Sequence, residues 1–353
     1  MHMADALLSP AVGGGMWAVS AGTIAYCSAK VRRSLDDRKV PLMGVLGAFL
    51  FAAQMINFSI PGTGSSGHLG GGLLLAILLG PCAAFLTIAS VLVVQALFFA
   101  DGGLLALGCN IFNMGFFPAF VVFPFCYQRL IGPDPGKIRL TTLTMISAVV
   151  GLQLGPLAVV LETLASGISS LPPATFLVLM QPIHLAIGAV GGLVTVAVVS
   201  LVREARPDIL HDCRDVGRIG KSPVHQALLA FLLVALITAG GLSAFASKNP
   251  DGLEWAIAKT TGNAGLKAQQ SGVHGILAQL QEKIAFLPDY GFRKQSEKRG
   301  TAFPEKVTPD SALPATGVAG IVGTLVTLLL IFVSGLLLKK HSVRKVRKVY
   351  GIN

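Results

Sequence analysis

Long apolar runs, separated by short polar or charged connections, follow one another along most of the chain. A helix needs about 20 apolar residues to cross the roughly 30 Å hydrocarbon core of a bilayer. Charged residues make up 13% of the sequence, whereas a soluble domain has about 25%. The pattern therefore predicts an all-α integral membrane protein. The predicted spans are 12–30, 41–59, 69–81, 82–99, 104–128, 140–165, 175–202, 225–246 and 317–338.

The stretch 69–99 has two interpretations, because Pro81 lies within it. Proline lacks the backbone N–H of an interior helical residue, so it either separates two helices or kinks one. As a separate span, 69–81 reaches only about 20 Å. Protein would then have to shield part of it from lipid, as is found for helices near binding sites.

The distribution of Lys and Arg decides between these interpretations, since cytoplasmic loops are rich in both. Four segments hold 19 of the 28 Lys and Arg residues, namely 30–39, 129–139, 203–221 and 339–348. Four others hold none, namely 1–15, 59–68, 100–103 and 166–174. A break at Pro81 places all basic segments on one side. We expect nine crossings of a bacterial cytoplasmic (inner) membrane, with the N-terminus outside and the C-terminus in the cytoplasm.

Span spacing divides the chain into two units. Residues 1–203 form a predicted seven-span bundle with short connections, and 204–224 form a basic cytoplasmic linker. Residues 225–353 form a two-helix hairpin whose spans flank a long extracytoplasmic loop, 247–316. This arrangement is typical of two functional units fused into one chain.

Catalytic patterns are absent from the sequence. The segment Gly217–Ser222 resembles the end of a phosphate-binding loop, but Asp215 stands where the full pattern requires Gly. The net charge of +11 follows from the cytoplasmic loops, so we expect the lipid bilayer as partner and no nucleic acid. We expect a protein that is not an enzyme and has no resident cofactor, with any ATP hydrolysis on separate ATPase subunits.

The N-terminus offers a metal chelate. With Met1 retained, its amine, the amide nitrogen of His2 and the His2 imidazole Nδ1 form two adjoining chelate rings. His68 lies in a Gly/Ser-rich connection, 61–72, predicted on the same side of the membrane, and adds a fourth nitrogen. Four nitrogens in a plane suit Ni²⁺, while imidazole also suits cobalt, copper and zinc. Each histidine alone is also compatible with a structural role.

Four further residues have competing interpretations. Asp5 and Asn57 lie near the predicted ligands in sequence and are expected to orient them by hydrogen bonds, although Asp5 is equally suited to cap a helix. Glu162 lies near the outer end of a span, where we expect it to cap the helix or extend toward the interface. His184 is expected to be a hydrogen-bonded core histidine.

At these motifs the sequence resembles the substrate-specific subunit of nickel/cobalt energy-coupling factor transporters. Met1–Pro10 resembles the N-terminal signature of that family, Gly67–Gly72 its second ligand region, and Gln181–Gly188 a late helix. A glutamate is common in that helix where this chain has Gly191. Asn249–Trp255 resembles the signature of the small accessory subunit. That motif contains Pro250, Asp251, Gly252, Leu253 and Glu254.

The resemblance implies a substrate-capture bundle fused to its accessory subunit. It also implies that Met1, His2 and His68 bind the metal, and that a transmembrane coupling subunit and cytoplasmic ATPases assemble with the chain. Ala21, Ala25 and Ala29 recur every four residues and permit close helix contact. The family uses such a stripe to contact the coupling subunit, but a contact inside this chain is equally compatible with the spacing.

We interpret the protein as the substrate-binding membrane component of an ATP-driven metal importer, for nickel first and cobalt second. A proton-coupled secondary metal transporter is one alternative, and would need intramembrane carboxylates, of which Glu162 is the main candidate. A membrane scaffold that binds no metal is the other alternative.

Overall fold

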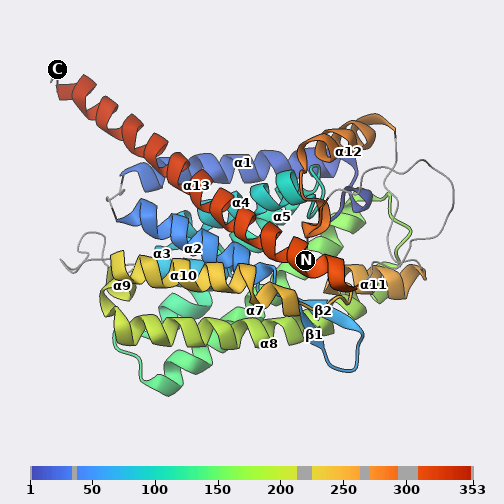
Figure 1. The fold of residues 1–353 in the computed structure, drawn as a ribbon, viewed down its shortest axis with the longest axis horizontal. Coiled ribbons are helices and arrows are strands. Elements are labelled where there is room, and N and C mark those ends of the chain that lie inside the picture. Colours follow the sequence, from blue (N-terminus) through green and yellow to red (C-terminus); the bar gives the residue numbers. More distant parts are fainter. Residues whose placement is uncertain (1, 34–37, 213–224, 263–270, 293–308, 351–353) are drawn as a thin grey trace.

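Long helices run lengthwise through the molecule in a computed structural model that describes residues 2–33, 38–212, 225–262, 271–292 and 309–350 (Figure 1). Each predicted span contains helix. The helices of the first unit are α1 (Pro10–Arg33), α2 (Lys39–Gln54), α3 (Gly72–Leu79), α4 (Pro81–Phe99), α5 (Leu107–Ile111), the π-helical η2 (Phe112–Gln128), α6 (Arg129–Ile131), α7 (Lys137–Ser166), α8 (Pro173–Ala205) and α9 (Pro207–Asp212). Those of the second unit are α10 (His225–Gly240), η3 (Leu242–Phe245), α11 (Gly252–Thr261), α12 (Gly272–Ile284), η4 (Pro288–Tyr290) and α13 (Pro309–Tyr350).

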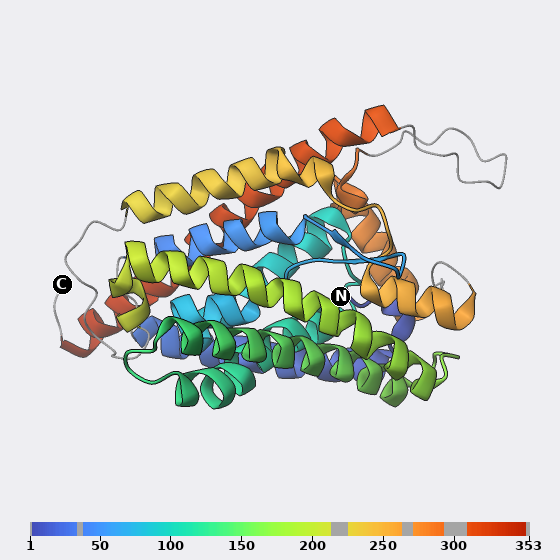
Figure 2. The same ribbon diagram turned by 90° about the horizontal axis from the view of Figure 1, so that it is seen from below.

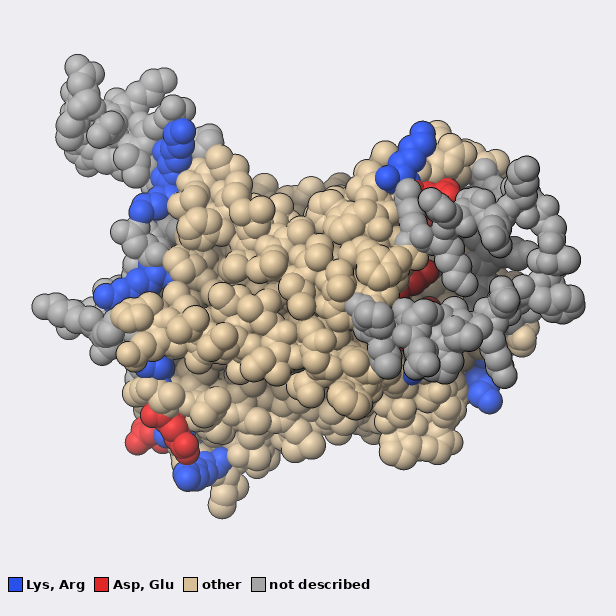
Figure 3. Space-filling view, in the orientation of Figure 1, with Lys and Arg blue, Asp and Glu red and all other residues tan. Residues whose placement is uncertain are grey.

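Membrane character is confirmed by the length and composition of these helices. Among the described residues, five helical segments are long and apolar enough to cross a bilayer, and α2 and α10 are shorter apolar helices. Large apolar side chains such as Leu161, Leu193 and Leu329 are exposed, as expected for a surface that faces lipid. Lys and Arg lie toward the two ends of the molecule, with an uncharged band between them (Figure 3). The number of crossings and their orientation stay predictions.

A break between two helices occurs at Pro81, as the sequence predicts. Helix α3 ends at Leu79, Gly80 adopts φ 78°, and α4 begins at Pro81. Glycine permits this positive φ without steric cost. Every residue of α3 is buried, which meets the expectation that protein shields this short helix.

Second-unit helices pack on the first unit along α2 (Figure 2). Gly320 of α13 lets this helix approach α10 closely, because a Cβ there would lie 2.5 Å from the carbonyl oxygen of Ala239. Small residues permit such backbone contacts in membrane helices. Residues 213–224 of the predicted linker, and 263–270 and 293–308 of the predicted loop, lie outside the described residues.

One end of the bundle holds the N-terminal segment, a small hairpin and the short helices of the second unit (Figures 1 and 2). The hairpin consists of β1 (Phe58–Ile60) and β2 (Ser65–Gly67), paired antiparallel with Phe58 opposite Gly67. The N-terminal segment contains the 3-10 turn η1 (Asp5–Leu7). Both predicted histidine ligands therefore lie at this end of the molecule.

Candidate metal site

The N-terminal segment is buried and held by hydrogen bonds. Met3, Leu7 and Leu8 are fully buried. The N–H of Met3 donates to Asn110 Oδ1 at 2.8 Å, and its carbonyl accepts from the N–H of Gly103 at 2.9 Å. Because both backbone groups of Met3 are paired, the preceding residue, His2, has a defined position.

Gly103 permits this close approach. A Cβ at that position would lie 1.8 Å from Asp5 Oδ1 and 2.5 Å from the Asp5 backbone nitrogen. The Asp5 carboxylate accepts a hydrogen bond from the N–H of Ala106 at 2.9 Å. Asp5 therefore joins the N-terminal segment to the chain just before α5. Whether it also orients a bound metal, as predicted, is not tested by these contacts.

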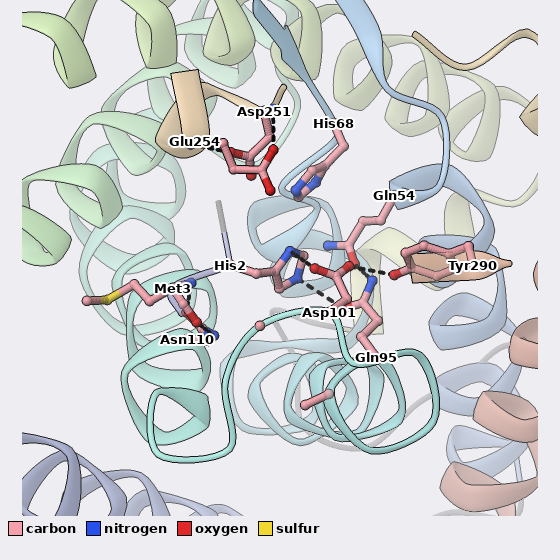
Figure 4. A network of polar contacts seen from close by, with 12 residues as sticks. His2, Met3, Gln54, His68, Gln95, Asp101, Asn110, Asp251, Glu254 and Tyr290 are labelled. Carbon is pink, nitrogen blue, oxygen red and sulfur yellow. Dashed lines mark hydrogen bonds and ion pairs between the residues drawn. The ribbon is translucent and has the colours of Figure 1, made fainter. Parts of the chain in front are cut away.

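The imidazole of His2 lies between polar groups of α4 and the loop that follows it (Figure 4). Nδ1 is 3.2 Å from Asp101 Oδ1, and Nε2 is 3.2 Å from Gln95 Oε1. The ring also stacks on that of His68, with 5.2 Å between centroids and 22° between planes. Two histidines separated by 65 intervening residues in the sequence are thus neighbours, as predicted for two ligands of one ion.

His68 directly follows β2 and precedes the N-terminus of α3. Its side chain is buried, and Nδ1 is 3.2 Å from the carbonyl oxygen of Leu69. Gly71, the N-cap of α3, has φ 73°, a conformation that glycine adopts readily. This turn directs the chain from the hairpin into α3 and leaves the His68 ring facing His2 (Figure 4).

Burial changes the ionisation of both histidines. Loss of solvent around the ring lowers the pKa of His2, against the opposing charge of Asp101. Loss of solvent also lowers the pKa of His68 well below its ordinary value. Burial therefore favours the neutral form of both imidazoles, most strongly for His68, and the neutral form is the one that binds metal ions.

A chain of side-chain amides connects the two histidine segments. Gln95, which contacts His2, donates from Nε2 to Gln54 Oε1 at 2.9 Å. Gln54 in turn donates to the carbonyl oxygen of Gly70 at 3.2 Å. These contacts fix the spacing between α2, α4 and the backbone that follows His68.

The predicted accessory motif contacts the hairpin that precedes His68. Ser66 N–H donates to the carbonyl of Pro250 at 2.8 Å, and its hydroxyl donates to that of Asn249 at 2.8 Å. Trp255 Nε1 donates to the carbonyl of Thr63 at 2.9 Å. The second unit thus binds β2 and the turn before it through two backbone carbonyls and the Trp255 side chain.

Two carboxylates of this motif form a capping box at the start of α11. Asp251 Oδ1 accepts from the N–H of Glu254 at 2.8 Å, and Glu254 Oε2 accepts from the N–H of Asp251 at 3.3 Å. A capping box satisfies two backbone donors reciprocally. Both side chains lie beside His68 (Figure 4). Burial, followed by the charge of Asp251, raises the pKa of Glu254.

A second contact joins the accessory unit to the loop beside His2. Tyr290 donates from its hydroxyl to Asp101 Oδ2 at 2.5 Å, and its ring stacks on Phe99 at 4.9 Å. Gln281 donates to the carbonyls of Ala96 and Gly102, at 2.9 and 2.7 Å. The accessory unit therefore contacts the segments on both sides of the histidine pair.

Asp101, Gln95 and Tyr290 were not identified by sequence reasoning as parts of this site. Asp101 lies in a short connection between two predicted spans, and Gln95 lies in an otherwise apolar helix. An amide in an apolar run is a weak signal of a buried polar contact, because such groups need partners. Only the tertiary structure shows that the partner of the Gln95 amide is His2.

Glu162 corrects an expectation. Its side chain is buried and accepts a hydrogen bond from Asn113 Nδ2 at 2.8 Å, so it neither caps its helix nor extends to the interface. Asn113 also lies 4.0 Å from the sulfur of Met3. A buried carboxyl group needs a hydrogen-bond partner, and Asn113 of the neighbouring helix η2 supplies one.

His184 lies in α8, where we expected a hydrogen-bonded core histidine. Its side chain is only 1% exposed, and Nδ1 is 2.8 Å from the carbonyl oxygen of Met180, one turn earlier in the helix.

The remaining predicted residues lie as follows. The Asn57 carbonyl accepts from the N–H of Ser247 at 2.6 Å, linking the start of the hairpin to the second unit. Ala21 and Ala25 are exposed on α1, and Ala29 is half-buried. Met1 lies outside the described residues. Within the described part of the chain, no three His, Cys, Asp or Glu side chains are grouped to hold an ion together.

Comparisons with known proteins match two segments of the chain to two family models. Residues 2–209 match a family model described as the cobalt uptake substrate-specific transmembrane region, and residues 225–340 match the PDGLE domain. A provisionally named metal transport protein of Haloquadratum walsbyi is 35% identical over 60% of this chain and 93% of its own. The fused nickel transport protein NikMN of Rhodobacter capsulatus is 29% identical over 82% of this chain and 88% of its own. A crystal structure of a transition metal transporter superposes with a TM-score of 0.52 at 29% identity, covering 61% of this chain and 99% of that one.

Proposed function

This chain belongs to the family of cobalt uptake substrate-specific transmembrane regions, and from that membership we propose that it captures Ni²⁺, or Co²⁺ with lower preference, for uptake. The observation that supports this most directly is the stacked, buried pair of His2 and His68. Burial favours the neutral form of both rings, and imidazole nitrogens are good ligands for these metals.

The proposed chelate consists of the Met1 amine, the His2 amide nitrogen, the His2 Nδ1 and an imidazole nitrogen of His68. Since Nδ1 of His2 lies next to Asp101, metal capture exchanges this carboxylate contact for the ion. Nickel is favoured over cobalt because four planar nitrogens suit Ni²⁺, and because a fused relative is named for nickel transport.

The accessory unit is proposed to order the site. Its motif binds the His68 hairpin, and Tyr290 binds the residue that contacts His2. A protein that transports metal needs the ligands placed before the ion arrives, because ordering them on binding weakens affinity. The second unit therefore holds the ligands in position before the ion binds, and so raises the fraction of chains that can bind it.

Uptake is proposed to need a transmembrane coupling subunit and cytoplasmic ATPases. The exposed small residues Ala21 and Ala25 of α1 are suited to contact a partner helix. We place the N-terminus outside and the C-terminus inside the cytoplasmic membrane. This follows from the distribution of Lys and Arg.

Titration of purified protein with Ni²⁺ and Co²⁺ tests the chelate. Protein with a native N-terminus is compared with a form extended by two residues before Met1, which retains both histidines but converts the α-amine into an amide. We expect one tightly bound Ni²⁺ in the native form and loss of that binding in the extended form. Equal binding would show that the amine is not a ligand, and absence of binding in both would contradict metal capture.

Transport itself is tested in proteoliposomes with and without the partner subunits and ATP. Uptake only with both would support the proposed mechanism. Uptake by the chain alone, driven by a proton gradient, would instead support the secondary transporter. Ala25→Leu should prevent assembly with the coupling subunit and leave metal binding intact.

A further inference from the structure

A groove lies between α13 of the second unit and the helices of the first unit. Its volume is about 560 Å³, and residues of α1, α2, α4 and α13 line it. Ser334 and Leu337 of α13 belong to the lining and are exposed, so the groove reaches the surface that faces lipid. It lies toward the end of the bundle where α1 ends and α2 begins (Figure 1).

The groove forms because α13 packs closely on α2 and crosses α1 only briefly (Figure 1). A Cβ at Gly335 of α13 would lie 2.4 Å from Cγ1 of Val40, and one at Gly47 of α2 would lie 2.3 Å from Cδ1 of Ile331. Glycines permit such close approach of membrane helices. The seam with α2 is therefore tight, and the space is left on the side of α1.

The interior of the groove is apolar. Val31 of α1, Ala89 of α4 and Ile331 of α13 are buried residues of its lining. The hydroxyl of Ser90 donates to the carbonyl oxygen of Leu86 at 2.9 Å, so its proton is already paired within α4. A surface of this kind favours a hydrocarbon chain over water.

Arg32 brings a positive charge to one end of the groove. Its side chain is half-buried and belongs to the lining. Within the part of the chain that the structure describes, its guanidinium forms no hydrogen bond and no ion pair. A guanidinium has five N–H donors in a planar fork that matches the oxygens of a phosphate.

The order of these features along α1 is that of a phospholipid. Arg32 lies just beyond the predicted span 12–30, at the depth of lipid headgroups. From Arg32 the lining continues inward to Ile24, about 12 Å along the helix. Lys30 and Arg33 add charge in the same turn of α1, and Lys and Arg lie toward this end of the molecule (Figure 3). Basic pockets between membrane helices on the cytoplasmic side bind anionic headgroups.

We propose that the groove binds an anionic phospholipid of the cytoplasmic leaflet, with its phosphate on Arg32 and an acyl chain between α1, α4 and α13. This site lies apart from the histidine pair and does not depend on metal capture. The bound lipid fills the space between the two units. It therefore helps to hold α13 of the accessory unit against α1.

Native mass spectrometry of the full chain, released from bilayer discs with equal amounts of phosphatidylglycerol and phosphatidylcholine, measures lipid retention. The wild type should retain the anionic lipid about five-fold more than the zwitterionic one. Arg32→Gln should lose most of this preference. Arg33→Gln is the matched control, because Arg33 is exposed and outside the lining, and it should keep the preference. Ser28→Phe, which places a ring in the groove without changing charge, should reduce retention of the anionic lipid.

Equal retention of the two lipids by the wild type would overturn the proposal, even if a variant did not fold. Equal losses in Arg32→Gln and Arg33→Gln would also overturn it, by assigning the preference to the basic end as a whole.

A photo-cross-linker at Ser90 tests the occupant in the assembled transporter. We expect cross-links to lipid. Cross-links to the coupling subunit in their place would assign the groove to a protein partner and overturn the proposal. Nickel titration of the same variants should match the wild type, so failure of this proposal is distinguishable from failure of metal capture.

Discussion

His2 and His68 stack on each other, but the segments that contain them are held in different ways. The segment of His2 is held mainly by the first unit, where Met3 pairs with Asn110 and Gly103 and the His2 ring contacts Asp101 and Gln95. The second unit adds a contact between His274 Nε2 and the carbonyl oxygen of Leu8, at 2.8 Å. The hairpin before His68 is bound largely by the second unit, through Ser66, Thr63 and the 249–255 motif.

The two segments therefore depend on the accessory unit to different degrees. The first unit supplies both backbone partners of Met3, and the accessory unit adds contacts at Leu8 and Gly102. The accessory unit bonds directly to the hairpin before His68, at Ser66 and Thr63. Because the accessory unit is fused to the first unit, these contacts form within one chain and thus at high effective concentration. We expect loss of a contact to the hairpin to affect His68 more than His2.

The largest expected effect is loss of a ligand. His2→Ala and His68→Ala should each weaken Ni²⁺ binding by roughly 100-fold or more, beyond the range found when the partners of ligands are removed. Calorimetric titration of the purified protein measures this. If either variant bound nickel as tightly as the wild type, that histidine would not be a ligand.

The second-largest expected effect on nickel binding is steric, and it should differ between the segments of His2 and His68. At Gly103, alanine would collide with the backbone of Asp5, and at Gly67 it would meet only the side chain of Ile187, with 2.4 Å from the new Cβ to Cγ1. Overpacking costs about 1–3 kcal/mol, and a side chain relaxes more easily than backbone. We expect Gly103→Ala to weaken nickel binding about ten-fold and Gly67→Ala to have a smaller effect.

The control for this pair is Gly14→Ala on α1, where no described atom lies within 4 Å of the new Cβ. This variant should bind nickel and unfold thermally like the wild type. A greater loss of nickel affinity in Gly67→Ala than in Gly103→Ala would contradict the expectation that backbone at Gly103 yields less easily than the side chain at Gly67.

Loss of a contact between the accessory unit and the His68 hairpin should have a smaller effect on nickel affinity. Trp255→Phe removes the hydrogen bond to Thr63 and retains an aromatic ring. One such bond contributes about 1 kcal/mol, so affinity should fall about five-fold. Hydrogen exchange should also become faster in residues 58–67 and stay unchanged at Met3. Faster exchange in both regions would contradict separate positioning.

Tyr290→Phe should weaken nickel binding less than Trp255→Phe, because this tyrosine contacts His2 only through Asp101. Loss of its hydroxyl leaves Asp101 with the His2 contact, which stabilises the state without metal. We expect affinity to fall roughly two- to three-fold, equivalent to about 0.5 kcal/mol, the lower end for a hydrogen bond. Titration beside Phe99→Leu, which removes the ring stack on Tyr290 and keeps its hydroxyl, separates the two interactions of Tyr290.

The smallest effect concerns imidazole ionisation. The pKa of His68 is lowered well below its ordinary value, so this ring remains neutral as the pH falls from about 8 to 6.5, the ordinary pKa of histidine. Over this range His68 should add no proton competition, while the amine and amide must lose protons to bind the ion, so affinity still rises with pH. The slope of affinity against pH should not change between wild type and His68→Gln. A shallower slope in the variant would show that His68 titrates there.

Much of the architecture could be predicted from the chain alone. Apolar runs identified where the helices lie, and Pro81 marked the end of α3, because the local rules for proline and glycine need no tertiary information. The sequence also proposed His2 and His68 as ligands of one ion, from the resemblance of their motifs to a metal-transporter family and from their predicted side of the membrane. Their rings stack in the structure, and their role as ligands stays a prediction.

The contacts around the histidines required the tertiary structure. Asp101, Gln95 and Tyr290 belong to segments far apart in sequence, and their partners depend on how helices pack. Hydropathy reports the average environment of a segment, so it shows that a residue is buried without showing its neighbour. By itself the sequence determined the helices and the candidate ligands. The packing of two units at one end of the bundle decided which polar groups surround them.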